Sequence, residues 1–230
     1  MENIIHSPNI SPTGIRAFFT TRYFSENHNS MREALIGESE LEEENIYLPI
    51  QKHTNHIHIL ESNMGPVTAD AVITDRPDIL IGIVVADCVP ILVYDQNRKI
   101  IGAVHAGWKG TAGGILEKTF QLMMERFKSR ADDVLVSIGP SIKKCSYEVD
   151  ADVKEAVEGK TGQGNYIDPE GDKYMLDLAE ANRIQALNSG VPEKNIWKSE
   201  ICTFCNPDIY YSYRYAKETI GRQGGFIGMW

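Results

Sequence analysis

Short runs of apolar and β-branched residues recur along the chain and predict strands. The clearest run, from Ile79 to Val85, is almost entirely apolar, which is typical of a strand that is buried on both faces of its sheet. The pattern predicts strands at 15–20, 46–52, 56–60, 80–86, 90–95, 99–105, 134–139, 195–201 and 209–214. Many short strands therefore form the framework of the fold.

Three segments carry apolar residues at helical spacing. Residues 112–128 have a wide apolar face, and residues 175–189 have a similar face that stops before Gly190, where a glycine commonly ends a helix. A third helix is expected over 150–158, because Asp150 is a good N-cap residue. The apolar faces, including their methionines, predict helices that pack against a sheet.

Two stretches, 24–45 and 159–174, lack this periodicity and predict exposed loops, the first with some helix. The strand pattern resumes after each stretch, so neither is expected to be a linker between domains. We therefore predict one compact α/β domain over residues 1–230, with a mixed β-sheet and flanking helices.

Composition and charge narrow the class of protein. The chain has 42% hydrophobic residues and a net charge of −9, and no block of lysine or arginine offers a site for a nucleic acid polymer. No apolar stretch is long enough to cross a membrane, and residues 1–10 lack the apolar core of a signal peptide. We therefore expect a cytoplasmic protein whose four cysteines are thiols or metal ligands rather than disulfides.

Candidate chemistry gathers where two apolar strands end. Asp87 and Cys88 follow one strand, and His105 ends the next strand before a glycine-rich turn. A lone buried cysteine or a hydrogen-bonded histidine would be unremarkable, but here both lie where the hydrophobic pattern stops and polar residues begin. If the two strands are neighbours, we expect Cys88 and His105 to converge.

His53 ends another apolar run and is a third candidate. Two imidazoles and one thiolate suit Zn²⁺, and three protein ligands leave a fourth tetrahedral position open, as in catalytic zinc sites. The wide spacing of His53, Cys88 and His105 along the chain makes this pattern unspecific. His56 and His58 are interpreted as residues on the surface of a strand and are kept as reserve ligands.

Other residues are open to two interpretations. The turn from Gly107 to Gly114 contains Lys109 and could bind an anion through its N–H groups, but its spacing favours a simple strand-to-helix turn. Tyr213, Arg214 and Arg222 could stack on a base or hold a phosphate, or could belong to an interface. The Cys202-x-x-Cys205 pair is a weak zinc signal alone, and with Cys145 it is interpreted as structural or pocket-lining.

Several motifs together resemble one family. In chain order they are Ala86-Asp87-Cys88-Val89-Pro90, His105-Ala106-Gly107-Trp108-Lys109-Gly110, Ile138-Gly139-Pro140, Cys145-Ser146-Tyr147-Glu148-Val149, Cys202-Thr203-Phe204-Cys205, Ser212-Tyr213-Arg214 and Gly221-Arg222-Gln223. This combination resembles the laccase-domain family, long labelled multicopper polyphenol oxidase, whose members are described as purine nucleoside phosphorylases with adenosine deaminase activity. The resemblance extends from about Thr20 to the C-terminus.

The resemblance implies a fold, a metal and a set of substrates. The fold would be the single-domain, cysteine-hydrolase-like laccase-domain fold, and zinc would be held by His53, Cys88 and His105. The substrates would be phosphate and the nucleosides adenosine, inosine, guanosine and methylthioadenosine, with deamination of adenosine as a second activity. The family offers no expectation here for the oligomeric state.

Roles for further residues follow from that function. Phosphorolysis needs phosphate held against the ribose, and the candidate holders are Arg22, Lys109, Arg214 and Arg222. Deamination needs an acid, for which Asp87 and Glu148 are the candidates.

The sequence departs from the family pattern at four places, one of which is a shorter loop leading to His53. Arg22 is followed by Tyr23-Phe24-Ser25-Glu26 instead of a glycine-rich turn. Lys109 and Tyr215 each stand where the family motifs have an arginine. These changes affect contacts to the substrate, whereas the three expected metal ligands are present.

Four other functions compete with this one. Cys88 could be a nucleophile with His105 as its base in a cysteine hydrolase, as in a toxin deamidase of related fold, or the protein could be a peptidoglycan-editing factor acting on a muropeptide precursor. Copper oxidase chemistry is disfavoured because six histidines with one His-x-His pair do not build a multicopper set. A non-enzymatic binding protein would not need ligand-type residues at several strand ends.

Overall fold

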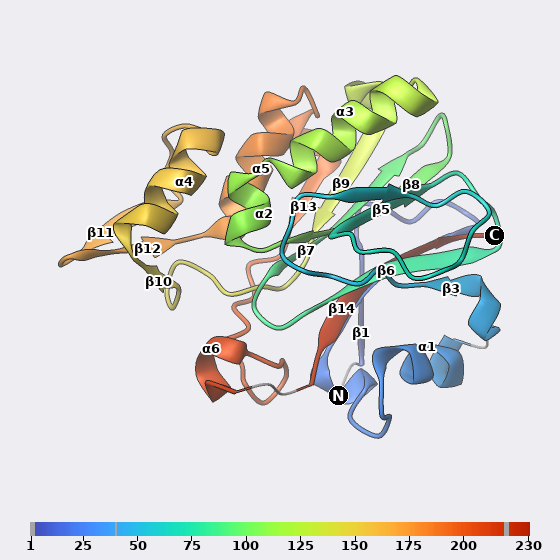
Figure 1. Ribbon diagram of the computed structural model, residues 1–230, viewed down its shortest axis with the longest axis horizontal. Helices are drawn as coiled ribbons and strands as arrows, with labels where there is room; N and C mark the ends of the chain where they lie inside the picture. Colours follow the sequence, from blue (N-terminus) through green and yellow to red (C-terminus); the bar gives the residue numbers. More distant parts are fainter. Residues whose placement is uncertain (1–2, 40, 219–220) are drawn as a thin grey trace.

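The computed structural model describes residues 3–39, 41–218 and 221–230, and it places two large sheets face to face between layers of helices (Figure 1). The strands are β1 (Ile4–His6), β2 (Ile15–Thr20), β3 (Ile46–Tyr47), β4 (Ile57–Ile59), β5 (Ala71–Thr74), β6 (Ile79–Val85), β7 (Val89–Asp95), β8 (Ile100–Ala106), β9 (Val134–Ile138), β10 (Glu148–Val149), β11 (Ile167–Glu170), β12 (Lys173–Leu176), β13 (Ile196–Lys198) and β14 (Gln223–Met229). The helices are α1 (Met31–Ser39), α2 (Trp108–Ala112), α3 (Ile115–Phe127), α4 (Ala151–Thr161), α5 (Leu178–Asn188) and α6 (Tyr213–Ala216).

One sheet has six strands in the order β13-β9-β7-β8-β5-β4, and the other has five in the order β1-β2-β14-β6-β3. Helices α2, α3 and α5 cover the outer face of the six-stranded sheet, and α1 lies on the opposite side of the molecule against the five-stranded sheet (Figure 1). A small sheet, β10-β12-β11, lies beside α4. The resulting order of layers is helix, sheet, sheet, helix.

The strands β7 and β8 are buried along their whole length because each of their faces meets a different core. In β7, Ile91 and Val93 face the helices, while Leu92 packs between the two sheets. A side-chain period of two therefore places apolar residues on both faces, which explains the nearly continuous apolar sequence of these strands. The ends of β7 and β8 are thus held by the most buried part of the protein.

The structure confirms the α/β class with mixed sheet and flanking helices, and it shows that the strands divide into separate sheets. The helix expected over 112–128 is broken at Gly113 and Gly114, and the latter has a left-handed φ of 67°. Helix α5 starts only at Leu178, because the Asp177 side chain accepts a hydrogen bond from Glu180 N–H and caps the helix there. Gly190 follows α5 with a φ of 89°, as expected of a terminating glycine.

Two predicted elements differ from the structure. The prediction of a strand over 209–214 is wrong, because residues 213–216 form the short helix α6, whose N-cap is Ser212. The loop expected over 159–174 contains the antiparallel pair β11 and β12. Asp150 does occupy the N-cap position of α4, but its carboxylate pairs with Lys173 at 3.6 Å instead of capping the helix. Within the described residues, no helix has both the length and the hydropathy needed to span a bilayer.

Candidate metal centre

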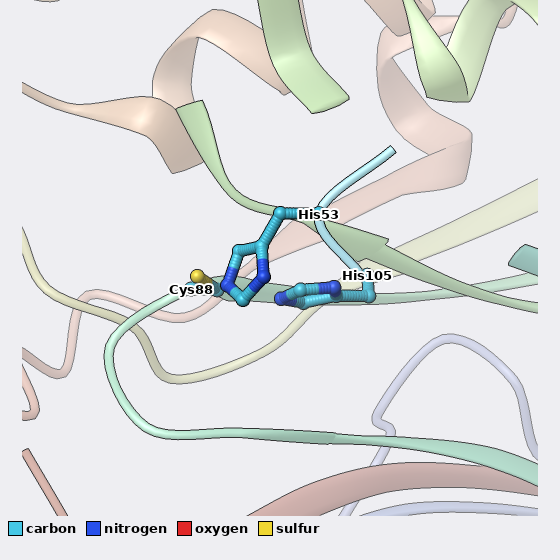
Figure 2. A group of neighbouring side chains, drawn as sticks. All are labelled: His53, Cys88 and His105. Carbon is cyan, nitrogen blue, oxygen red and sulfur yellow. The ribbon is translucent and has the colours of Figure 1, made fainter. Parts of the chain in front are cut away.

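Three side chains from separate segments converge at one end of the six-stranded sheet. Cys88 directly precedes β7, and His105 is the second-last residue of β8. Because β7 and β8 are antiparallel, with Pro90 opposite His105, the start of one strand lies beside the end of the other. His53 reaches the same point from the loop between β3 and β4 (Figure 2). The three ligand atoms lie within 4.8 Å of one another.

Gly107 makes this close approach possible. A Cβ atom at position 107 would lie 3.0 Å from Cys88 Sγ and 3.3 Å from His53 Cδ2. Both contacts are tighter than a side chain normally tolerates, so a larger residue would push the thiol and the imidazole apart. The glycine that follows β8 therefore has a packing role at the centre itself.

Asp70, which immediately precedes β5, organises the two histidines. Its carboxylate is fully buried and accepts a hydrogen bond from His105 Nδ1 at 2.8 Å. The same carboxylate accepts from His53 N–H at 3.0 Å and from Thr54 N–H at 2.6 Å. With Nδ1 of His105 engaged, Nε2 is left to face Cys88. A carboxylate behind a histidine is a common arrangement at metal sites, where it selects the tautomer and the ring orientation.

The loop that carries His53 is held on its other side by Gln51. The Gln51 amide donates to Val84 O and accepts from Val84 N–H, both at 2.8 Å, and so ties the loop to β6. His53 itself has a left-handed φ of 56°, a conformation that non-glycine residues seldom adopt. Gln51 and Asp70 together therefore hold an unusual backbone geometry that turns the imidazole toward Cys88.

The surroundings of Cys88 and His105 favour a thiolate beside an imidazolium. Burial raises the pKa of Cys88, but hydrogen bonds from His105 and His53 and the charges on both rings outweigh burial and bring this pKa to about 6. Burial lowers the pKa of His105, but hydrogen bonds with Asp70 and Cys88 raise it to about 9. Burial also raises the pKa of Asp70, but the hydrogen bonds from His105 and Thr54 outweigh burial and hold this pKa below its usual range. The donor set is thus polarised before any metal binds.

A second buried carboxylate, Asp87, holds the C-terminal segment next to the centre. Its side chain accepts hydrogen bonds from Thr203 Oγ1 at 2.6 Å, Ser212 Oγ at 3.0 Å and Arg214 N–H at 2.7 Å. Asp87 has a left-handed φ of 85°. Both of its carboxylate oxygens are therefore engaged with donors from residues 203–214.

Tyr147 links this segment to the centre. The guanidinium carbon of Arg214 lies 5.0 Å from the centre of the Tyr147 ring, and Arg214 Nη1 donates to Glu148 O at 2.9 Å. Burial raises the pKa of Tyr147 to about 12, and the negative charge of Cys88 adds to this rise. Tyr147 is therefore protonated at neutral pH and close enough to Cys88 to be affected by its charge.

The remaining candidate phosphate holders are Lys109, Arg22 and Arg222. Lys109 is exposed at the start of α2, with its Nζ 5.6 Å from the centre of the Trp108 ring. Arg22 donates to Pro207 O at 2.7 Å and stacks on Tyr211, and Ser25 donates to Arg222 O at 3.0 Å.

Arg22 thus contacts Pro207 and Tyr211, whereas the side chain of Arg214 contacts Tyr147 and Glu148. Tyr213 is 54% exposed on α6, and the Glu148 carboxylate pairs with Lys173 at 3.2 Å. The reserve ligands His56 and His58 do not join the centre, and the His58 ring lies against Tyr47.

Sequence reasoning missed Asp70, Gln51 and Tyr147. Asp70 precedes the short apolar run of β5, and a single charged residue before such a run is a weak signal. Gln51 lies two residues before His53 and shows its role only through its contact with β6. Tyr147 belongs to the Cys145-Ser146-Tyr147-Glu148-Val149 motif of the family resemblance, but the resemblance implies no role for its side chain.

The fold and site define an α/β protein with a His–Cys–His group that could hold a metal ion at one end of its six-stranded sheet. The chain belongs to the family described as multi-copper polyphenol oxidoreductase laccase, which matches residues 24–230.

A Staphylococcus epidermidis protein named purine nucleoside phosphorylase is 33% identical, with 95% of this chain and 87% of that protein covered. Purine nucleoside phosphorylase YlmD of Geobacillus stearothermophilus is 38% identical, with 69% of this chain covered, and the match spans only 59% of that relative's length.

Solved structures share the whole fold. The crystal structure of YlmD from Geobacillus stearothermophilus aligns with a TM-score of 0.89 at 28% identity, covering 99% of this chain and 96% of the other. The crystal structure of the hypothetical protein YfiH of Bacillus licheniformis aligns with a TM-score of 0.88 at 27% identity, covering 94% and 93%. The laccase-domain fold expected from the sequence is therefore confirmed.

Proposed function

We propose that this protein is a zinc-dependent purine nucleoside phosphorylase that also deaminates adenosine. The observation that carries the proposal is the convergence of His53, Cys88 and His105 around a point that a buried carboxylate supports from behind. Two relatives of the same family carry the name purine nucleoside phosphorylase, which supports the choice of substrate class. The small-molecule partners would be a purine nucleoside and phosphate.

The donor set fits zinc better than the copper of the family description. Two imidazoles and one thiolate are borderline-soft ligands that suit Zn²⁺, and three protein ligands leave a fourth position for substrate or water. Of the six histidines in the chain, two take part in the group, which is too few for a multicopper centre. Bound zinc would supply a Lewis acid that polarises an oxygen atom of water or substrate.

Phosphorolysis breaks the bond between ribose C1′ and the base nitrogen and forms a bond from a phosphate oxygen to C1′. The base leaves with the bonding electron pair and takes up a proton. Among the four candidate cations, the geometry favours Arg214 as phosphate holder, because it rests on Tyr147 beside the centre and its N–H is anchored by Asp87. The exposed ring of Tyr213 on the same helix offers a stacking face for the base.

Deamination of adenosine replaces the amino group at C6 with an oxygen from water and releases ammonia, which requires a proton for the leaving group. Asp87 was a candidate for this role, yet its carboxylate accepts three hydrogen bonds and is already committed to residues 203–214. We therefore propose that Asp87 positions the Arg214 segment and that the proton comes from another group.

A cysteine hydrolase is the second candidate, and one observation favours it. The Cys88 thiol and a ring nitrogen of His105 lie within 4.8 Å of each other, and the lowered pKa of Cys88 and raised pKa of His105 give the pair the polarity of a nucleophile and its base. Such an enzyme could act on a muropeptide precursor, as a peptidoglycan-editing factor would. Zinc and a free nucleophilic thiolate are mutually exclusive at Cys88, so metal content separates the two functions.

The test is zinc content and nucleoside turnover measured on one preparation of the full chain, with the Cys88→Ala variant beside it. We expect Cys88→Ala to lose the zinc ion of this centre and both nucleoside activities together, because two neutral imidazoles hold the ion much more weakly. Lys118→Ala, an exposed change on α3, is the matched control and should keep both. If Cys88→Ala stays folded by circular dichroism and retains that zinc while all activity is lost, the hydrolase function replaces the phosphorylase.

A further inference from the structure

A second group of thiols lies outside the His53–Cys88–His105 centre. Cys145 belongs to the loop after β9, and Cys202 and Cys205 belong to the loop after β13. The three Sγ atoms lie within 4.8 Å of one another, and those of Cys145 and Cys205 are 3.5 Å apart. Cys202 is buried and the other two cysteines are exposed. We call these three residues the thiol cluster.

The sheet brings the two loops together. Strands β9 and β13 are parallel neighbours, so the chain leaves both strands at the same edge. The loops stay paired beyond the strands, since Ser199 N–H donates to Ile138 O at 2.8 Å and Thr203 N–H donates to Ser141 O at 3.1 Å. The meeting of Cys145 with the Cys-x-x-Cys pair is therefore a consequence of the parallel register rather than of chance contacts between loops.

The chain around Cys202 is closed into a tight turn. Asn206 Nδ2 donates to Cys202 O at 2.8 Å, and Asn206 N–H donates to Thr203 O at 3.3 Å. A tight Cys-x-x-Cys turn that places both thiols on one side is well suited to holding a metal ion.

A buried lysine supplies an independent sign of a missing partner. Lys143 is 6% exposed, and its Nζ has no hydrogen-bond partner among the described residues. Burial lowers the pKa of Lys143, and the charges of Asp177, Lys198, Glu200 and Cys202 act on it as well. Three thiolates around a divalent ion carry a net charge of about −1 by simple summation, and this negative charge would balance the ammonium of Lys143.

We propose that the thiol cluster binds one Zn²⁺ ion through Cys145, Cys202 and Cys205. Tetrahedral zinc with Zn–S bonds of about 2.3 Å separates its sulfur ligands by about 3.8 Å. The observed separations, 3.5 Å for one pair and at most 4.8 Å for the others, need only small side-chain rotations to reach that value. Water completes the coordination, because two of the three cysteines are exposed.

A disulfide between Cys145 and Cys205 is the main competing fate of these thiols. Its bond would be about 2.05 Å long, so the two sulfur atoms would have to approach by more than 1 Å. It would also leave Cys202 unused, although Cys202 is the buried member of the cluster. The metal uses all three thiols, whereas the disulfide uses two.

The ion would tie together the loops that lead to Tyr147 and to the Asp87-bound segment. Cys145 lies two residues before Tyr147, and Cys202 directly precedes Thr203, which donates to Asp87. The cluster would then hold the substrate side of the first centre without touching substrate. This gives it a structural role that is separate from the catalytic zinc.

The test is a titration of the reduced, chelated chain with Zn²⁺ against a chromophoric chelator. We expect two ions per wild-type chain, one in Cys88→Ala and one in Cys205→Ser. Lys144→Ala, next to Cys145 but without a thiol, is the matched control and should bind two. The proposal is overturned if a folded Cys88→Ala chain binds no zinc, or if Cys205→Ser binds as many ions as the wild type.

A second measurement needs no variant. Alkylation of the wild-type chain is followed site by site by mass spectrometry, with and without saturating Zn²⁺. We expect zinc to slow the modification of Cys145 and Cys205 at least tenfold. Unchanged rates at these two positions, or a Cys145–Cys205 disulfide that persists when zinc is present during purification, would rule the site out.

Discussion

Two buried aspartates organise neighbouring regions of this protein, and they do so for different purposes. Asp70 accepts hydrogen bonds from His105 Nδ1 and from the backbone of the His53 loop. Asp87 accepts from Thr203, Ser212 and the Arg214 backbone, all in the C-terminal part of the chain. The first carboxylate stands behind the ligands, and the second holds the segment that we assign to substrate.

The difference shows how one site can be divided into parts that respond separately. A buried carboxylate with several donors is costly to disturb, because each lost bond leaves an unsatisfied buried group. Disturbing Asp70 should therefore affect the metal, and disturbing Asp87 should affect the nucleoside or phosphate. Three experiments test this separation.

The largest effect is expected from pH, acting on the Asp70 region. In the metal-free chain the pKa of Cys88 is about 6 and that of His105 about 9, so between these values the thiol has lost its proton while His105 keeps one. Imidazole must be neutral to bind metal, so binding releases about one proton and zinc affinity should rise about tenfold per pH unit in this window. Competition titrations across the window measure the slope.

The slope should level off above the pKa of His105 and should be the same in Asp87→Asn, whose change lies in the other region. An affinity that does not vary with pH would contradict the proton assignment. If the slope changed in Asp87→Asn, the two regions would be coupled rather than separate.

Asp70→Asn should weaken zinc binding at the first centre and nucleoside turnover by about 10–100-fold, the loss typical of a supporting partner of a metal ligand. The asparagine amide cannot accept hydrogen bonds from all of the groups that now donate to the Asp70 carboxylate, and it lacks the negative charge that stabilises protonated His105. Zinc content and turnover should fall in parallel, and added zinc should restore part of the activity. Normal zinc content with lost turnover would mean that Asp70 acts in the chemistry instead.

Asp87→Asn should have the smallest effect on the metal and a moderate effect on substrate. Asparagine tolerates the left-handed backbone at this position, but it exchanges an acceptor for a donor opposite Thr203 or Ser212. We expect KM for phosphate to rise about tenfold, with zinc content unchanged, since a lost buried hydrogen bond is worth on the order of 1–3 kcal/mol. A fall in kcat of about 10²–10⁴ at unchanged KM would instead identify Asp87 as the proton donor.

Much of the centre could be predicted because its ligands lie where strong patterns stop. Cys88 and His105 each follow or end a run of buried apolar residues, but those two runs, β6 and β8, lie in different sheets. The antiparallel pairing of β7, which starts directly after Cys88, with β8 brings the two side chains together. Asp70 could not be predicted in the same way, because β5 is short and its pairing with β8 depends on the whole sheet. Supporting residues are defined by contacts across the fold, which a local pattern does not contain.

The C-terminal segment shows where local preference is overridden. Residues 209–214 are aromatic-rich and favour a strand, yet Ser212 caps a helix there while its hydroxyl also donates to Asp87. The reverse occurs in β14, whose three glycines disfavour a strand in isolation. They fit because β14 lies between β2 and β6, where a Cβ at Gly224 would lie 2.5 Å from Ile83 O and one at Gly228 would lie 2.2 Å from the Trp230 ring. Tertiary contacts decide both segments.

The three candidate ligands of the first centre differ in the freedom of the chain that carries them. Cys88 directly precedes the fully buried strand β7 and His105 lies near the end of β8, whereas His53 is exposed on a loop held mainly by Gln51 and Asp70. Local opening of such a loop costs far less free energy than opening of core strands. We therefore expect an ion to arrive and depart on the His53 side, with the other two ligands stationary, so that the exchange rate reports the opening of this loop.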